Sequence, residues 1–245
     1  AAPLAQARDL LQRLEAIDAS GRATALGRDM AALGMHPRLG HMVLRARGLG
    51  LARLACEIAA VLSERDPVRG GPGSPDPDLR TRLDALHGRA LPHGVTVDRG
   101  GLRRIERVVQ QIERQLARSS QSHRGGGSAV TDTDAAGLLL AFAYPDRIGR
   151  ARAETGGRYA LSGGRGAVLP GPAALARSEY IVVAALDAGE REARIQLAAP
   201  LDPQQLEEHL ADSIEDSTLV EWDPRSETVA ARRPRRIARL ERGVG

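Results

Sequence analysis

The chain has 245 residues, of which 42% are hydrophobic, and 35 basic against 31 acidic residues give it a net charge of +4. This apolar content can bury one to three compact cores and excludes a fully disordered protein. No run approaches the roughly 18 apolar residues of a membrane-spanning helix, and no secretory signal is recognisable, so we expect a cytoplasmic protein without membrane contact. The single cysteine, Cys56, excludes a disulfide framework and a cysteine-based zinc site.

The positive charge is concentrated at the C-terminal end. Residues 225 to 245 contain seven arginines against Glu227 and Glu241, a net charge of +5, and the rest of the chain carries −1. Every basic residue is an arginine, a bias that a GC-rich genome explains but that still supplies forked donors for phosphate. The tail therefore predicts a polyanionic partner, although charges that keep an exposed edge strand from aggregating are an equally physical explanation.

Residues 1 to 50 have the periodicity of short helices. Apolar residues lie on one stripe over residues 4 to 17, which predicts the first helix. Thr24 is a natural N-cap for a second helix, and Pro37 can open a third. Three helices with a possible wing are therefore expected. Because the first residue is alanine and a helix follows almost at once, we expect the polypeptide to continue upstream.

A second helical segment is expected over residues 51 to 118. A fourth helix runs over residues 51 to 62, and a proline- and glycine-rich surface segment follows over residues 66 to 78. Apolar residues then recur every three or four positions between Leu102 and Leu116, which predicts a longer helix. The opposite face of this helix is either solvated or directed at nucleic acid. It carries Arg103, Arg104, Arg107, Arg114 and Arg118 against Glu106 and Glu113.

The composition changes at residues 119 to 134, where serine, glycine and short polar residues predict a flexible linker and a domain boundary. A helical run then ends at Pro145, and the period changes from helix to strand. Short strands are expected at 158 to 161, 166 to 169, 180 to 186, 192 to 198, near 218 to 222 and from 228 onward, with a helix capped by Asp202 among them. Five or more short strands predict a small barrel within residues 135 to 245.

No complete catalytic centre is recognisable. A P-loop requires a lysine that reaches the β- and γ-phosphates, and the chain has no lysine. His36 and His41 are five residues apart, a spacing that does not put two metal ligands on one helix face. There is no G-x-S-x-G motif, and Asp132 and Asp134 fall in the expected linker, where no apolar wall would raise a carboxyl pKa. We therefore expect no catalytic residue, metal or cofactor in this chain.

A glycine-rich segment, Gly163-Gly164-Arg165-Gly166, allows two interpretations. A hairpin turn requires such glycines, and the same turn would let the backbone approach a phosphate or sugar beside a guanidinium. Aromatic residues make up only 2% of the chain, too few for extended base-stacking platforms. Contacts to the nucleic-acid backbone would then dominate any binding.

Several motifs resemble the region that follows the motor in DEAH-type ATP-dependent helicases, and in particular in the bacterial HrpB helicases. The resemblance covers most of residues 1 to 223. It rests on motifs in this order: Thr24, Leu26-Gly27, Met30-Ala31, Leu33, His36-Pro37, Leu39, Met42, Leu54-Ala55-Cys56-Glu57, Ala143-Tyr144-Pro145-Asp146-Arg147-Ile148, Gly157-Arg158-Tyr159, Gly164-Arg165-Gly166-Ala167 and Glu192-Ala193-Arg194-Ile195.

The resemblance implies a multidomain α+β fold. A degenerate winged helix is expected at 1 to 50, a ratchet-like helical bundle at 51 to 118 and, after the linker, an OB-like β-barrel with a basic tail at 135 to 245. In such helicases two RecA-like motor domains hydrolyse ATP with Mg²⁺, and the trailing modules close a channel around single-stranded RNA or DNA. The motor is absent from this chain, so the resemblance implies a nucleic-acid-binding accessory region that is inactive alone.

The candidate nucleic-acid contacts are arginines, because a guanidinium can pair with a phosphate through two hydrogen bonds. In the barrel they are Arg147, Arg158, Arg165 and Arg194, and in the tail Arg232, Arg233, Arg235 and Arg236. Arg147 could equally be a structural partner of Asp146. The alternative function is a protein-interaction region that docks a partner or the motor and touches nucleic acid only incidentally.

Overall fold

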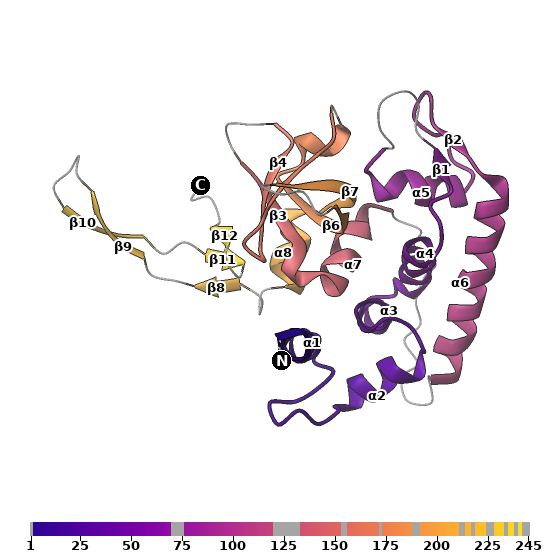
Figure 1. The fold of residues 1–245 in the computed structure, drawn as a ribbon, viewed down its shortest axis with the longest axis horizontal. Helices are drawn as coiled ribbons and strands as arrows, with labels where there is room; N and C mark the ends of the chain where they lie inside the picture. Colours follow the sequence, from indigo (N-terminus) through magenta and orange to yellow (C-terminus); the bar gives the residue numbers. More distant parts are fainter. Residues whose placement is uncertain are drawn as a thin grey trace.

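The computed structural model describes residues 2–69, 76–119, 133–152, 156–171, 173–187 and 192–210, together with five short strands between Ile214 and Glu241. A layer of helices lies beside a β-barrel, and helix α7 lies between them (Figure 1). The helices are α1 (Ala2–Arg13), α2 (Ala25–Ala32), α3 (Pro37–Gly48), α4 (Ala52–Ser63), α5 (Leu79–Leu86), α6 (Arg99–Ser119), α7 (Ala136–Ala143) and α8 (Pro203–His209). The described residues also contain three 3₁₀ turns: η1 (Thr133–Ala135), η2 (Pro145–Arg147) and η3 (Ala174–Arg177).

The first helix is shorter than its apolar stripe predicts. It ends at Arg13, and Glu15 adopts a positive φ of 54° that breaks the helical path. The carboxylate of Asp18 then accepts hydrogen bonds from the backbone amides of Ser20 (2.9 Å) and Arg22 (3.0 Å). Through these bonds the Asp18 side chain stabilises a tight turn of the backbone, so the helix does not continue. The cap of the second helix is confirmed, since the Thr24 hydroxyl accepts from the Gly27 amide at 2.9 Å.

The predicted long helix is α6, and its apolar seam packs against α4. Ile105, Val109, Ile112 and Leu116 are buried, whereas Leu102 is half-buried. Two short strands, β1 (Val68–Arg69) and β2 (Thr96–Val97), pair antiparallel beside this layer. The linker predicted at 119 to 134 lies outside the described residues except at its ends: Ser119 closes α6, and Thr133 and Asp134 belong to η1.

The barrel is confirmed. Its strands are β3 (Ile148–Ala151), β4 (Arg158–Leu161), β5 (Gly166–Val168), β6 (Tyr180–Leu186) and β7 (Ala193–Pro200). They close in the order β3-β4-β5-β7-β6, with β5 and β7 parallel and the other neighbours antiparallel. Numbered within the barrel this order is 1-2-3-5-4, a five-stranded barrel of the OB type.

Two expectations about strands need correction. The sequence does not predict strand β3, because its four residues contain Gly149 and show no alternating pattern. Its glycine lies in close packing, since a Cβ there would lie 3.0 Å from the end of the Leu161 side chain, which would have to shift. The strands near 218 and 228 exist as β9 (Leu219–Asp223) and β10 (Thr228–Arg232), but they pair only with each other and lie outside the barrel. The remaining strands, β8 (Ile214–Asp216), β11 (Arg235–Ile237) and β12 (Leu240–Glu241), form a separate sheet.

Helix α7 joins the helical layer to the barrel. All eight of its residues are buried, and one cluster of buried side chains runs from Leu14 through α7 to Val182 and Ala199 on the barrel. A Cβ on Gly137 would lie 1.9 Å from the carbonyl oxygen of Pro200, so the helix backbone rests directly on the end of β7. A second cluster, with Tyr159 and Ile195, fills the barrel interior.

Candidate nucleic-acid interface

The candidate site lies where the end of α7 meets the barrel. Its base is an ion pair between Arg38 of α3 and Asp146 of η2, joined by two hydrogen bonds of 2.6 and 3.0 Å. Arg38 also donates to the Ala143 carbonyl at 2.9 Å, so it fixes the turn that follows α7. Burial alone would raise the pKa of Asp146, but the hydrogen bonds and charge of Arg38 hold that pKa below its usual value. The carboxylate is therefore ionised and engaged with α3.

Arg147 does not form the ion pair with Asp146 that is its alternative interpretation, because Arg38 occupies that carboxylate. The Arg147 guanidinium instead donates to the Ala184 carbonyl at 2.8 Å and lies 4.9 Å from the centre of the Tyr144 ring. One of its nitrogens thus joins η2 to β6. A guanidinium has five N–H donors, so further donors remain for a ligand.

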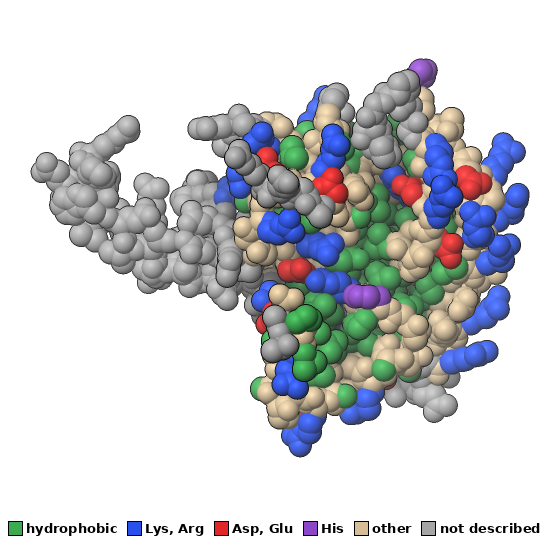
Figure 2. Space-filling model, viewed as in Figure 1, with side chains coloured by type: hydrophobic (Ala, Val, Ile, Leu, Met, Phe, Trp, Pro, Cys, Tyr) green, Lys and Arg blue, Asp and Glu red, His purple; other side chains and the backbone are tan. Residues whose placement is uncertain are grey.

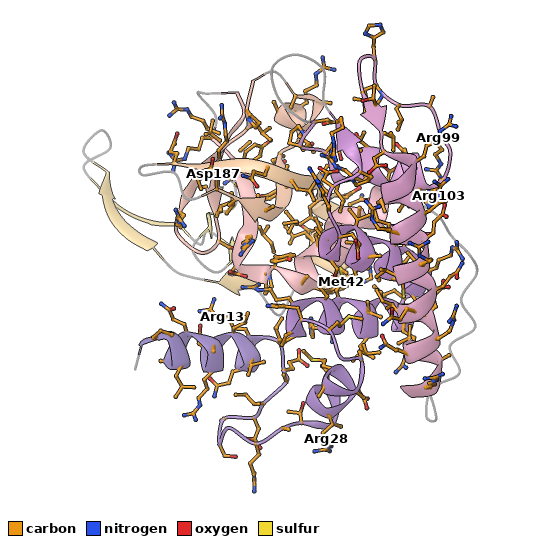
Figure 3. The ribbon with its side chains drawn as sticks, turned by 45° about the vertical axis from the view of Figure 1, so that its right-hand side comes forward. Arg13, Arg28, Met42, Arg99, Arg103 and Asp187 are labelled. Atoms are coloured by element: carbon orange, nitrogen blue, oxygen red, sulfur yellow. The ribbon has the colours of Figure 1, made fainter. Side chains whose placement is uncertain are left out.

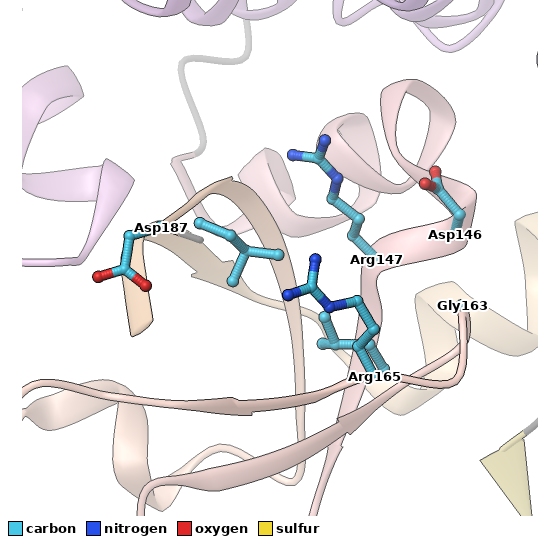
Figure 4. A pocket seen from close by; sticks show the side chains of 7 residues that line it. Asp146, Arg147, Gly163, Arg165 and Asp187 are labelled. Atoms are coloured by element: carbon cyan, nitrogen blue, oxygen red, sulfur yellow. The ribbon is translucent and has the colours of Figure 1, made fainter. Parts of the chain in front are cut away.

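Arg147 and Arg165 line one pocket of about 390 Å³. Both guanidinium groups point into it, with Asp187 on one side of them and Asp146 and Gly163 on the other (Figure 4). Arg165 is exposed, and the described part of the chain offers its side chain no ion-pair or hydrogen-bond partner. Of the two carboxylates that line the same hollow, Asp146 is paired with Arg38 and Asp187 accepts from the Arg194 amide. The unpaired Arg165 guanidinium is therefore free to contact an anionic ligand such as a phosphate.

The turn that carries Arg165 is tight because of its glycines. The Gly163 amide donates to the Asp146 carbonyl at 2.9 Å, and a Cβ on Gly163 would lie 2.8 Å from that oxygen. Gly164 has a φ of 86°, a conformation that favours glycine. The glycine-rich segment is therefore a hairpin turn between β4 and β5 that also borders the pocket, so its two interpretations are compatible.

A second hollow of about 610 Å³ adjoins the first and shares Asp146 and Gly163 with it. It is bounded on the other side by α1, including Asp9 and Arg13, and by Arg38. The two hollows together form a depression between the first helix and the barrel turn.

The other two barrel candidates lie on a different part of the barrel. Arg158 and Arg194 each pair with Val168 in register, so they share the outer face of β4, β5 and β7, two strands or about 10 Å apart. Arg158 forms an ion pair with Glu192 at 3.2 Å, which partly neutralises it. Arg194 is exposed, and its backbone amide donates to Asp187 at 2.8 Å. The four candidates thus form two pairs, and the pair that lines the pocket described above is Arg147 and Arg165.

The tail candidates lie largely outside what the structure describes. Arg233 is outside the described residues, and for Arg232, Arg235 and Arg236 the structure describes the strand backbone of β10 and β11 but not the side chains. Their contact with nucleic acid stays a prediction.

Arg38 and Tyr144 are part of the site but are not among the candidates from the sequence. The Arg38 guanidinium lies 5.1 Å from the centre of the Tyr144 ring, so this ring is contacted by both Arg38 and Arg147. Arg38 is 108 residues from Asp146, and no local pattern in the sequence could have paired them. Within the described residues there is no group of three potential metal ligands and no helix that could cross a membrane.

His41 couples α3 to α7 beside this site and makes stability depend on pH. Its Nδ1 lies 2.7 Å from the Phe142 carbonyl, whereas its Nε2 is buried without a partner in the described structure. Burial lowers the pKa of His41, although the bond to Phe142 opposes this shift. A lowered pKa means that His41 binds a proton less readily in the folded protein than in the unfolded one. The folded state is therefore fully stable above the unfolded-state pKa of about 6.5 and loses stability as the pH falls below that value.

We therefore expect the free energy of unfolding to decrease between pH 7.5 and pH 5 in urea titrations. The variant His41→Asn keeps a donor near Phe142 but does not titrate, so its decrease should be shallower. His36, whose pKa is also lowered by burial, titrates in both proteins and cancels in the comparison. Parallel pH profiles for the two proteins would contradict this role of His41.

Comparison with known proteins shows which helicases this chain is similar to. Residues 7–35 match the family model described as "Helicase associated domain (HA2), winged-helix". The chain is 35% identical over 239 residues to the ATP-dependent RNA helicase HrpB of Escherichia coli, a match that covers 97% of this chain and 26% of that protein.

Solved structures give the same result. A crystal structure of the E. coli DExH-box NTPase HrpB matches with a TM-score of 0.71 and 32% identity over 97% of this chain, and one of the E. coli DEAH/RHA helicase HrpB with 0.69 and 30% over 99%. The chain spans about a quarter of these relatives, 26% and 27% of their lengths. The predicted resemblance to HrpB, with a winged-helix segment, helices and a barrel, is confirmed.

Proposed function

We propose, from the premise that this chain corresponds to a post-motor region of an HrpB-like helicase, that it binds single-stranded nucleic acid at the pocket of Arg147 and Arg165. The observation that carries the proposal is the pair of guanidinium groups directed into one hollow of an OB-type barrel, with Arg165 unpaired in the described structure. Loops and strand faces of OB barrels are common binding surfaces for oligonucleotides. Arginines at such a surface contact phosphates without reading the base sequence.

The chain's part in the helicase reaction is to hold and guide the strand. ATP and Mg²⁺ would be bound by RecA-like motor domains of the same polypeptide, and translocation would be driven there. The described residues supply a fixed wall: Arg38 anchors η2 to α3, and the Gly163 turn is tied to Asp146. A rigid surface of this kind lets a strand slide past phosphate contacts without reorganisation of the protein. A cytoplasmic location remains part of the proposal.

Binding of a labelled oligonucleotide tests the proposal. Fluorescence anisotropy with a 12-nucleotide single strand should show binding at low salt, and the logarithm of the affinity should fall linearly with the logarithm of the salt concentration. The slope should be about −0.7 for each phosphate contacted, so two pocket arginines and the two on the outer face would give roughly −3. No binding at low salt, or binding that does not respond to salt, would contradict the proposal.

The alternative, a protein-interaction region, is favoured by one specific feature. Leu4 on α1 is 70% exposed, unusual for a large apolar side chain, and it belongs to the stripe that predicts this helix. A docking partner or the motor could cover it. Under this alternative the oligonucleotide would bind weakly and independently of Arg165.

A further inference from the structure

The exposed face of α6 is a continuous basic surface that the barrel pocket does not explain. We call it the α6 stripe, and it comprises Arg99, Arg103, Arg104, Arg107, Arg114 and Arg118. At 100° per residue these side chains occupy a sector of about 140°, opposite the buried seam. Figure 2 shows basic side chains along the right-hand edge of the molecule, over α6, and Figure 3 shows Arg99 and Arg103 pointing outward from it.

Acidic residues are absent from this sector. Glu106 and Glu113 lie together on one flank of the helix, and Glu113 is paired with Arg53 of α4 at 3.6 Å. The other residues within the sector are neutral: Gly100, Gln110, Gln111 and Ala117. Asp98, before the helix, pairs with Arg104 at 3.5 Å. Five arginines of the stripe have no ion-pair partner in the part of the chain that the structure describes: Arg99, Arg103, Arg107, Arg114 and Arg118.

This arrangement is unfavourable for an isolated solvated helix. No glutamate stands four residues from an arginine in α6, whereas Arg99 and Arg103, Arg103 and Arg107, and Arg114 and Arg118 are all four apart. Opposite charges at this spacing stabilise a helix, and like charges destabilise it by a similar amount. A simple solvated face would be expected to mix the signs. The segregation therefore indicates a surface whose repulsion is relieved by a polyanion.

We propose that the α6 stripe binds the phosphate backbone of double-stranded nucleic acid. From Arg99 to Arg118 the helix extends about 28 Å, a length over which a duplex presents roughly 16 phosphates. No aromatic residue lies in α6, so the stripe lacks the stacking platform that single strands use. A straight convex row of cations suits a rigid duplex instead. The stripe lies on the side of the helical layer away from the barrel, so the two surfaces are separate (Figure 1).

Anisotropy titrations with 20-base-pair RNA and DNA duplexes test the proposal. The chain should bind at least one of them at low salt, and the double variant Arg103→Glu/Arg107→Glu should bind that duplex at least tenfold more weakly. Its log–log salt slope should be shallower by about 2, because two contacts of 0.9 each are lost. The matched control Arg8→Glu/Arg177→Glu changes the net charge equally at exposed arginines outside the stripe and should bind within twofold of the wild type.

A loss of duplex binding by the stripe variant would not result from unfolding. The stripe variant gives residues 99 and 103, and residues 104 and 107, opposite charges, but it leaves residues 103 and 107 alike in charge and places a glutamate three residues before Glu106. These changes nearly offset one another, so its melting temperature should stay close to that of the wild type. Absence of duplex binding by the wild type, an unchanged affinity in the stripe variant, or an equal loss in the control would overturn the proposal. The single-strand binding proposed for the barrel is measured on a different probe, so the two proposals can fail independently.

Discussion

Arg165→Glu is expected to weaken binding of a single-stranded oligonucleotide about tenfold and to make its log–log salt slope shallower by about 0.7. Arg165 is exposed and its side chain has no partner in the described structure, so its charge is available to a phosphate in the pocket. The substitution removes this contact and places a carboxylate beside the ligand, where Asp187 already lines the wall. Anisotropy titrations over a range of salt concentrations measure both quantities.

Arg177→Glu is the matched control for this substitution. Arg177 is also an exposed arginine of the barrel region, but it lies in η3 and does not line the pocket. The Arg177→Glu variant should bind the oligonucleotide as tightly as the wild type does. The free energy of unfolding of both variants should lie within about 0.5 kcal/mol of the wild-type value, as is usual for surface substitutions. If both variants lose affinity equally, net charge and not the pocket determines binding.

Gly137→Ala is expected to destabilise the protein by at least about 3 kcal/mol. The new Cβ would lie 1.9 Å from the carbonyl oxygen of Pro200, and backbone on both sides prevents a local adjustment. Helix α7 would have to move away from β7, which would open the buried cluster that joins the helices to the barrel. Urea unfolding followed by circular dichroism measures the change.

Gly48→Ala is the control that separates the steric contact at Gly137 from the general effect of replacing a helical glycine by alanine. Gly48 ends α3 without a positive φ, and a Cβ added there would meet no heavy atom within 4 Å. Alanine has the higher helix propensity, so this variant should be as stable as the wild type or up to about 1 kcal/mol more stable. A Gly137→Ala variant that unfolds like Gly48→Ala would contradict the close approach of α7 and β7.

Features that depend on local chemistry could be predicted from the sequence. The Thr24 cap, the start of α3 at Pro37 and the Asp202 cap of α8 follow from residues within one helical turn. Strands β4 and β6 match their predicted bounds, because apolar side chains and flanking glycines or polar residues define them locally. The closure of the barrel could be anticipated from the number of short strands and from the resemblance to HrpB helicases, but not from any local motif.

Features that depend on long-range contacts could not be predicted in this way. The pairing of Arg38 with Asp146 joins residues far apart in the chain, and it corrects the interpretation of Arg147 as a partner of that aspartate. The shared pocket of Arg147 and Arg165 depends on how η2 and the β4–β5 turn meet in space. The outer face of α6 is an exception, because the apolar seam identifies it from the sequence as the exposed, basic side, and the packing of the seam against α4 confirms this.

Photocrosslinking tests binding at the pocket of Arg147 and Arg165 directly, because it locates the bound strand on the protein. A single-stranded oligonucleotide containing 4-thiouridine would be irradiated with the chain at low salt, and crosslinked peptides would be identified by mass spectrometry. We predict crosslinks in the two segments that border the pocket, residues 144–147 and 161–165, and their loss on competition with unlabelled strand. Crosslinks confined to other parts of the chain, with none in these two segments, would contradict binding at this pocket.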